Sequence, residues 1–374
     1  MKVAYIIESL PVGGVEVLTL DILSQFKKRG DVQALMVNLS GLGVKQQDYE
    51  QAGIEIISLN KNLSKNLSTN DIGNIPKLRR FFKQYQPDII HSQLFPANYF
   101  SRLAAWGLNI PVIVHNHSIV SDSNNSFRHR FINRKLSRLT SLYISVSKMV
   151  YDYTQQELNP AHKPSIVIYN AFNPEKMQVP AQDLGAMYGF AGPTIVQLGS
   201  MVETKNFDKT IMAFPKILKA IPSARLLLLG DGRLRPSLEA LVAKLELENK
   251  VVFTGYRNDV FAYLKSCQLL VMPSSFEGFP IAHLEAMACG LPAVISEHVP
   301  SKELAQNCVL FCDTTSDSIA ENILKLLSNQ ALYHEMSIQA RNLANKMTID
   351  HYCDSLVEVY NMLLRRAPFT RQVY

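Results

Sequence analysis

The segment 274–292, SSFEGFPIAHLEAMACGLP, holds the densest set of residues that can do chemistry. Glu277 and Glu285 are separated in it by seven residues. The segment follows an apolar run, turns, and then has the pattern of a helix from about Ile281. Both carboxylates can therefore face one ligand and accept hydrogen bonds from the vicinal hydroxyls of a ribose or hexose. The alternative is a helix-dipole partner beside a solvent-exposed glutamate.

Lys205 is a candidate ligand for an anion, in the sequence LGSMVETKNF. It lies where an apolar strand, 194–199, gives way to a helix that begins near Asn206. A lysine at a helix N-terminus opposes the helix dipole unless an anion lies between them. The backbone N–H groups at the helix start near Ile281 are also able to hold a phosphate or a sugar hydroxyl. A surface lysine is the alternative.

Two glycine-rich turns follow apolar strands. Gly13 and Gly14 open a helix after the first strand, but their spacing is not that of a G-x-G-x-x-G dinucleotide fingerprint. Gly230-Asp231-Gly232 follows the run ARLLLL and by itself is only a turn signal.

Histidines occur at the ends of two strands of the first half. His117 follows the strand PVIVHN, and His115 precedes it by two residues and points the same way. Which of the two matters stays open, with His117 preferred. His91, in DIIHSQ, is interpreted as structural.

A basic segment, 127–139, combines five cations with apolar side chains and has no acidic residue. The first half of the chain is basic as a whole, with 20 Lys and Arg against 13 Asp and Glu in residues 1–180, whereas residues 181–374 have 18 against 19. The segment is either a solvated basic helix or an interfacial helix attracted to anionic lipid. Its cations are Arg128, Arg130, Arg134, Lys135 and Arg138.

The elements that position these residues alternate between short apolar strands and amphipathic helices. Strand–helix–strand alternation predicts an α/β protein with two Rossmann-like, doubly wound parallel sheets and a ligand cleft between the domains. We expect an N-terminal domain at 1–172, a linker at 173–192, a C-terminal domain at 193–355, and a last helix at 356–374 that packs back on the N-terminal domain. Strands are expected near 2–8, 32–39, 54–59, 88–91, 111–115, 142–146, 165–169, 194–199, 224–229, 250–254, 268–272, 292–296 and 308–311.

Composition excludes several classes of protein. With 47% hydrophobic and 19% charged residues, the 374-residue chain is globular rather than disordered. We find no signal peptide pattern and no apolar run long enough to span a membrane. Cys308 and Cys312 lack further ligands for a zinc site. A cytoplasmic protein is expected, with peripheral attachment to the inner face of the cell membrane through the basic segment.

The string S-x-x-E-G-F-P-x-x-x-x-E-A-M-A-x-G-x-P resembles the signature of family-4 retaining glycosyltransferases, bacterial-type group 1 enzymes with the GT-B fold. The resemblance covers most of the chain. It implies that Glu285 binds the donor ribose and that Glu277 contacts the transferred sugar. Lys205 would bind the diphosphate. Further donor contacts implied by the resemblance are Gly14, Gly232, Tyr256, Arg257, Gly278, Phe279 and Pro280.

The resemblance also assigns chemistry. His117, Lys205 and Glu277 are the implied catalytic residues, with His117 near the reacting carbon. The donor is expected to be a UDP-sugar, the acceptor a saccharide or a lipid-linked glycan, and the product an α-glycoside of the kind found in surface polysaccharides. No metal or other cofactor is expected. One position departs from the family pattern, because Ser200 stands where an arginine is usual.

Three other functions compete with this one. A nucleotide-sugar epimerase of the same fold requires an acid–base set that the sequence does not display. A non-catalytic nucleotide-sugar-binding partner is consistent with Ser200 but not with intact Glu277, Glu285 and Lys205. A nicotinamide dehydrogenase is disfavoured by the glycine spacing.

Overall fold

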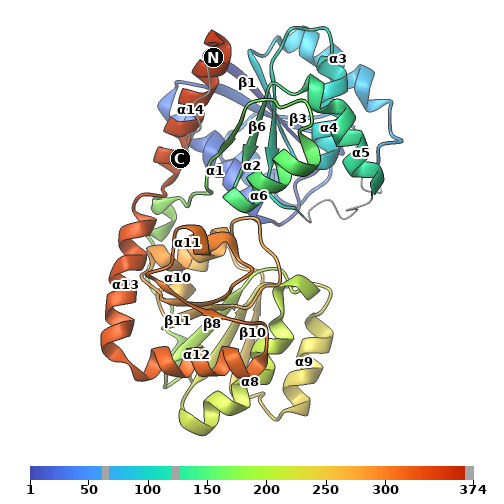
Figure 1. The fold of residues 1–374 in the computed structure, drawn as a ribbon. Coiled ribbons are helices and arrows are strands. Elements are labelled where there is room, and N and C mark those ends of the chain that lie inside the picture. The colour runs from blue at the N-terminus through green and yellow to red at the C-terminus, as the bar shows by residue number, and fades with distance from the viewer. Residues whose placement is uncertain (61–66, 120–126, 367–374) are drawn as a thin grey trace. The chain divides into compact units, whose positions relative to one another are not determined.

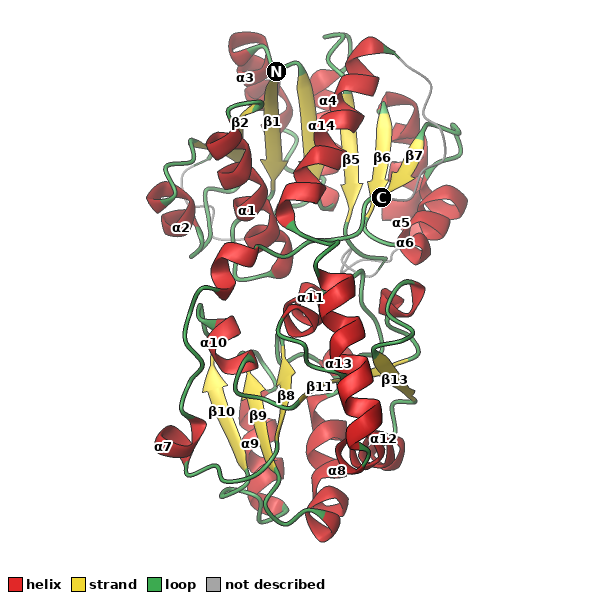
Figure 2. Ribbon diagram, turned by 90° about the vertical axis from the view of Figure 1, so that its left-hand side faces the viewer, coloured by secondary structure: helices red, strands yellow, loops and turns green. Residues whose placement is uncertain are grey.

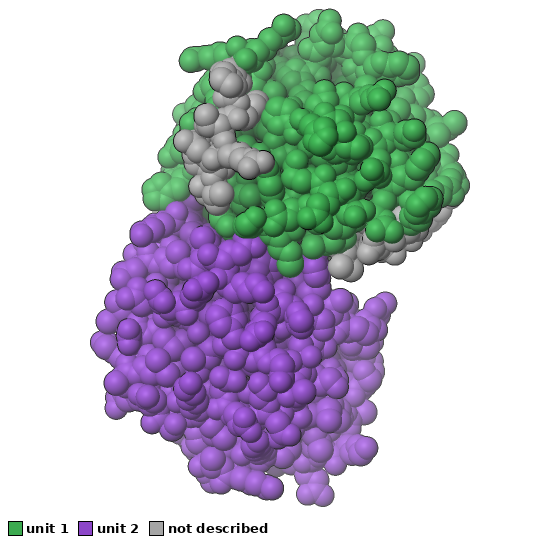
Figure 3. All heavy atoms as spheres, in the orientation of Figure 1, with its two compact units in different colours: residues 1–171, 349–374 green, residues 172–348 purple. Residues whose placement is uncertain are grey.

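The computed structural model describes residues 1–60, 67–119 and 127–366 (Figure 1). The chain forms two compact units (Figure 3). The first unit comprises Met1–Ala171 together with Ile349–Tyr374, and the second comprises Phe172–Thr348. The expected linker 173–192 belongs to the second unit and contains a short helix, α7 (Leu184–Tyr188).

The first unit is built on a parallel sheet with the strand order β3-β2-β1-β4-β5-β6-β7. Its strands within the described residues are β1 (Lys2–Ile7), β2 (Gln33–Asn38), β3 (Ile56–Ser58), β4 (Ile89–Gln93), β5 (Val112–Asn116), β6 (Leu142–Ser145) and β7 (Ser165–Val167). The helices are α1 (Gly14–Arg29), α2 (Gln46–Gln51), α3 (Asn74–Tyr85), α4 (Phe95–Ala105), α5 (Phe127–Leu136), α6 (Lys148–Tyr153) and α14 (Ile349–Arg365), with short helical turns at Ser137–Leu139 and Thr154–Leu158.

The second unit repeats this plan with the order β10-β9-β8-β11-β12-β13. Its strands are β8 (Thr194–Leu198), β9 (Arg225–Leu229), β10 (Val251–Gly255), β11 (Leu269–Met272), β12 (Ala293–Ser296) and β13 (Val309–Cys312). Besides α7, its helices are α8 (Phe207–Ala220), α9 (Arg235–Lys244), α10 (Val260–Leu264), α11 (Ile281–Ala288), α12 (Ser316–Ser328) and α13 (Gln330–Ala344), with turns at Pro174–Met177, Glu203–Lys205 and Pro300–Glu303. The predicted pair of doubly wound sheets is confirmed.

Each sheet has its own core. In the first unit, Ile6 and Val37 of the sheet share a buried cluster with Phe82 of α3 and Phe100 of α4. In the second, the apolar run of β9 packs in one cluster with residues of α8 and α12. Strands buried on both faces account for their near-continuous apolar sequences.

The last helix, α14, begins at Ile349 rather than at the expected 356, and the end of the expected range, 367–374, lies outside the described residues. It lies beside α1 in the first unit (Figure 2), where Arg29 forms an ion pair of 2.7 Å with Asp354. The strand order of each sheet reverses between two central strands, β1 and β4 in the first unit and β8 and β11 in the second. Ligands of doubly wound sheets bind at the carboxyl ends of such strands.

Candidate functional site

Lys205 and Glu277 meet at the reversal point of the second sheet. Lys205 follows β8 and Glu277 follows β11, and the Lys205 ammonium lies 2.5 Å from Glu277 Oε1. Ser274 Oγ donates to the same carboxylate oxygen at 2.9 Å. The side chain of Glu277 is 9% exposed and that of Lys205 is 24% exposed. The structure thus brings two of the predicted catalytic residues into direct contact.

Backbone and amide contacts hold Lys205 in place. Gln197, on β8, donates from Nε2 to the carbonyl of Lys205 at 2.8 Å. Asn206 adopts the left-handed conformation, with φ of 52°, between the turn 203–205 and α8. Its amide donates to the carbonyl of Pro273 at 2.7 Å and to Ser275 Oγ at 2.8 Å. These bonds tie the loop after β8 to the loop after β11 and hold the backbone at Lys205, whereas the ammonium is held by Glu277.

The loop that carries Glu277 leads into α11 as the sequence predicts. Gly278, Phe279 and Pro280 are buried, and the helix begins at Ile281. Glu285 lies one turn into α11 and is half-buried. The first turn of α11 thus begins four residues after Glu277, and backbone N–H groups at a helix start can bind an anion or a hydroxyl.

The glycines around this site allow close approach of two loops. A Cβ on Gly230, which has φ of 130°, would lie 2.0 Å from the carbonyl oxygen of Gly199. A Cβ on Gly232 would lie 2.6 Å from the carbonyl oxygen of Met201. Gly232 thus acts first as a packing residue, and its predicted contact with the donor would be made through the backbone.

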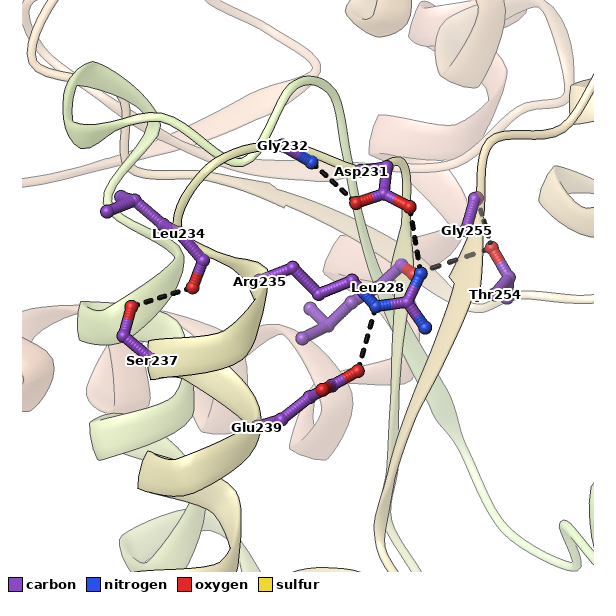
Figure 4. Close-up of polar contacts among 9 residues, drawn as sticks. All are labelled: Leu228, Asp231, Gly232, Leu234, Arg235, Ser237, Glu239, Thr254 and Gly255. Carbon is purple, nitrogen blue, oxygen red and sulfur yellow. Dashed lines mark hydrogen bonds and ion pairs between the residues drawn. The ribbon is translucent and has the colours of Figure 1, made fainter.

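Asp231, between these glycines, is engaged within its own turn. Its carboxylate accepts from the backbone of Gly232 at 2.7 Å and from Arg235 at 2.9 Å, and Arg235 also contacts Glu239 (Figure 4). These contacts fold the side chain of Asp231 onto the start of α9. These contacts within the protein account for the aspartate of the G-D-G turn. No contact between Asp231 and a ligand is needed to explain it.

Ser200, where the family usually has an arginine, is exposed. A different arginine reaches the same loop, because Arg233 forms an ion pair with Glu203, two residues before Lys205. The backbone of Leu234 also donates to Met201, next to Ser200, at 3.1 Å. The G-D-G turn therefore carries a guanidinium to the segment 200–205, which the sequence did not reveal.

Tyr256 and Arg257 follow β10. Tyr256 is 43% exposed, and an exposed tyrosine ring can stack on a planar ligand. The Arg257 guanidinium lies over the ring of Tyr263, 5.4 Å from its centroid. Arg257 therefore supports α10 through a cation–π contact.

In the first unit, Gly14 is the first residue of α1. The preceding Gly13 is extended, and a Cβ there would lie 2.3 Å from a carboxylate oxygen of Glu16. Burial raises the pKa of Glu16 to about 7. Gly13 thus leaves room for a buried carboxyl group at the start of α1, and Glu16 is a residue that the sequence alone did not single out.

His117 lies in a pocket at the carboxyl end of β5. Its ring stacks on that of His115 with centroids 4.1 Å apart, and the Nε2 atoms of both rings are buried without a hydrogen-bond partner among the described residues. The pocket is small and partly open to solvent, and Leu94, Asn98 and Asn133 also line it. Burial lowers the pKa of His117 to about 3, so the ring is neutral at physiological pH. Both histidines line this pocket, and His117 is 8% exposed whereas His115 is 1% exposed.

The basic segment forms α5 and the turn after it. Arg128, Arg134, Lys135 and Arg138 are exposed, whereas Arg130 lies 3.6 Å from Glu157 and is partly neutralised. Arg134 donates to backbone carbonyls of residues 156 and 157. Phe127 and Phe131 are 78% and 51% exposed, and their rings stack. Cations and aromatic rings thus share one surface of the first unit. None of the helices in the described part of the chain has both the length and the apolar character to cross a bilayer.

Both halves of the chain match models of known protein families. Residues 12–176 match the model of Glycosyltransferase Family 4, and residues 191–343 match that of Glycosyl transferases group 1. An uncharacterized glycosyltransferase of Haemophilus influenzae is 26% identical over 94% of this chain and 96% of its own length.

Two further proteins show similarity along most of the chain. The UDP-Gal:alpha-D-GlcNAc-diphosphoundecaprenol alpha-1,3-galactosyltransferase of Escherichia coli is 25% identical over 80% of this chain and 81% of its own length. The structure of HepE from Anabaena in complex with UDP superposes with a TM-score of 0.83 at 21% identity, over 96% of this chain and all of that chain, and shows the fold. With both halves matched and both sheets of the GT-B type, the chain belongs to the family-4, group 1 glycosyltransferases.

Proposed function

We propose that this protein is a retaining glycosyltransferase that moves a sugar from a UDP-sugar to a hydroxyl of a saccharide or lipid-linked acceptor and forms an α-glycosidic bond. The contact between Lys205 and Glu277 carries the proposal. A buried carboxylate held by an ammonium is preorganised to contact a sugar hydroxyl, and α11 begins four residues after this carboxylate. Glu285 would accept from the ribose hydroxyls, and Tyr256 would lie against the base.

The proposed chemistry is electrostatic. Negative charge develops on the diphosphate as the glycosidic bond breaks, and Lys205 with the first amides of α11 would neutralise it. The leaving phosphate oxygen would take the proton of the acceptor hydroxyl, which attacks from the same face of the sugar. No metal is assigned to this site, because the cation and the amides meet the charge of the diphosphate.

The acceptor class is inferred from a relative. The Escherichia coli galactosyltransferase acts, by its name, on a sugar linked to diphosphoundecaprenol. The exposed cations and aromatic rings of α5 are suited to an anionic membrane surface, where such an acceptor lies. We therefore propose a lipid-linked acceptor and peripheral attachment of the first unit through α5.

The reaction is tested by incubation with UDP-glucose, UDP-galactose and their N-acetylated 2-amino counterparts, with and without acceptor. We expect acceptor-dependent release of UDP from one of them, and an α-linked product by NMR. Interconversion of two UDP-sugars without release of UDP would identify an epimerase instead. Binding without turnover of any donor would identify a non-catalytic binding partner.

A further inference from the structure

Four side chains form a hydrogen-bonded series inside the first unit. The hydroxyls of Tyr5 and Tyr360 lie 2.6 Å apart, and the Tyr360 hydroxyl lies 2.6 Å from Nδ1 of His91. Nε2 of His91 lies 3.0 Å from Nδ1 of His115. The four residues come from β1, α14, β4 and β5, and none is more than 1% exposed. The series therefore reaches from the last helix of the chain to the histidine pocket.

The available hydrogen-bond partners determine which group donates at each step of the series. Among the described residues, the Tyr5 hydroxyl contacts only that of Tyr360, so its proton has no other acceptor. A buried hydroxyl whose proton finds no acceptor costs about 1–3 kcal/mol. Tyr5 therefore donates to Tyr360, and the Tyr360 proton goes to Nδ1 of His91. His91 is then protonated at Nε2 and donates to Nδ1 of His115, which leaves the proton of His115 on its own Nε2.

The protonated Nε2 of His115 is one of the groups that line the pocket beside His117. Two asparagines of the pocket also have donors to offer, since the Oδ1 atom of Asn98 accepts from Ser92 at 2.8 Å and that of Asn133 accepts from Arg102. Burial lowers the pKa of His91 to about 3 and that of His115 well below its ordinary value, so both rings are neutral. Neutral donors suit the oxygen of a hydroxyl group.

We propose that Tyr360 is a positioning residue, which acts through His91 to fix the tautomer of His115 that has its proton on Nε2 and can donate to a sugar hydroxyl in the pocket beside His117. The hydroxyl belongs either to the transferred sugar or to the acceptor. The assignment of a sugar rests on the proposed function, whereas the tautomer rests on the hydrogen bonds alone.

The tautomer is measured by two-bond ¹H–¹⁵N correlation in protein labelled with ¹⁵N-histidine, with the His115 signals identified by their loss in His115→Gln. In the wild type we expect the proton on Nε2. Tyr5→Phe should keep this pattern, because Tyr360 is still able to donate to His91. Tyr360→Phe removes a hydroxyl from the same cluster but should let the His115 proton distribute between both nitrogens.

Two results would overturn the positioning role. One is the finding that His115 of the wild type is protonated at Nδ1. This measurement requires no folded variant other than His115→Gln, which is used for assignment. The other is an unchanged tautomer in Tyr360→Phe. Kinetics give a second reading, since Tyr360→Phe should lower kcat at least tenfold while leaving the affinity for UDP within twofold, and Tyr5→Phe should change neither by more than twofold.

The hydroxyl is tested by saturating the labelled protein with UDP, with the UDP-sugars named above, and with methyl α-glycosides of the same sugars, each with binding verified by calorimetry. A shift of the His115 Nε2 signal with a UDP-sugar but not with UDP assigns the hydroxyl to the donor. A shift with a glycoside assigns it to the acceptor. Verified binding without any shift refutes the sugar assignment, and it does so even if the tautomer is as expected.

Discussion

The ammonium of Lys205 lies within 2.5 Å of the carboxylate of Glu277, although 72 residues separate them in the sequence. If this ammonium stabilises the departing diphosphate, Lys205→Ala should lower kcat at saturating donor on the order of 100-fold and also weaken UDP binding. Steady-state kinetics measure both. Lys209→Ala is the matched control, because the side chain of Lys209 on α8 is 41% exposed and pairs only with its neighbour Asp208 in the described contacts. A wild-type kcat in Lys205→Ala would make the lysine a structural partner of Glu277.

Glu285 supplies a test of the donor site. Glu285→Ala should weaken the binding of UDP by about 1.5–3 kcal/mol, which is roughly 10- to 150-fold in Kd, because a charge-assisted hydrogen bond to the ribose is lost. Isothermal titration calorimetry measures the change. Glu248→Ala, which alters an exposed glutamate just after α9, should leave Kd unchanged. Unchanged affinity in Glu285→Ala, with circular dichroism of the native protein, would remove the ribose assignment.

Turnover should survive removal of divalent metal. The proposed site meets the diphosphate with Lys205 and the amides of α11, so EDTA should reduce the rate of UDP release by less than twofold. The same assay with added magnesium or manganese serves as the comparison. Abolition by EDTA and recovery with either metal would show that the diphosphate needs a cation which this site does not provide.

The surface of α5 should bind anionic vesicles. Replacing Arg128, Lys135 and Arg138 with Glu should release the protein in liposome sedimentation at low salt, since each cation contributes about 1 kcal/mol near an anionic leaflet. These three are chosen because Arg130 and Arg134 contact the segment 156–157.

The control for this experiment carries the same change of net charge elsewhere. Lys219, Lys244 and Lys302 are exposed in the second unit, and their replacement with Glu should leave vesicle binding intact. If both triple variants are released equally, the net charge of the protein, and not the surface of α5, accounts for vesicle binding. Binding to neutral vesicles at the same level as to anionic ones would contradict the electrostatic model.

The first unit should lose stability in mild acid. Burial lowers the pKa of His91 and His117 to about 3, below the ordinary value near 6.5, and burial lowers that of His115 as well. Below about pH 6.5 the unfolded chain binds protons that the folded unit does not, so stability falls as the pH decreases toward 3. Three such groups amount to a loss of roughly 4 kcal/mol between pH 7.5 and 5.5. The raised pKa of Glu16, about 7, acts in the opposite direction and offsets roughly 2 kcal/mol of this loss, so a net loss remains.

Hydrogen exchange of peptides from β4 and β5, corrected for intrinsic rates, measures this loss. Peptides from β11 and β12 provide the comparison, because burial lowers the pKa of His283 in the second unit to about 4 and adds one such group there. His117→Gln should remove about a third of the histidine contribution to the pH dependence in the first unit. An equal pH dependence in both units would contradict the model.

The sequence predicted the strands well because each is a short apolar run between turn residues, a pattern that local geometry sets. It did not predict where α14 begins, since an amphipathic pattern continues across residues 349–356 and the start depends on packing against α1. The proximity of Lys205 and Glu277 followed from the family resemblance, but their direct ion pair did not. The contact of His91 with Tyr360 joins residues 269 positions apart, and no local pattern encodes it.

The first unit is built from two stretches that lie far apart in the sequence, and this affects the order in which it folds during synthesis. Its sheet is complete in sequence at residue 171, but Tyr360, which the series through His91 requires, is synthesised almost 190 residues later. At bacterial and eukaryotic elongation rates the ribosome needs roughly 10 to 40 s to cover that interval. During this time the second unit can fold while the first still exposes the apolar groove that α14 will fill. The nascent protein thus finishes its N-terminal half last, and a ribosome that stalls before Tyr360 leaves a unit that has its sheet but not its final helix.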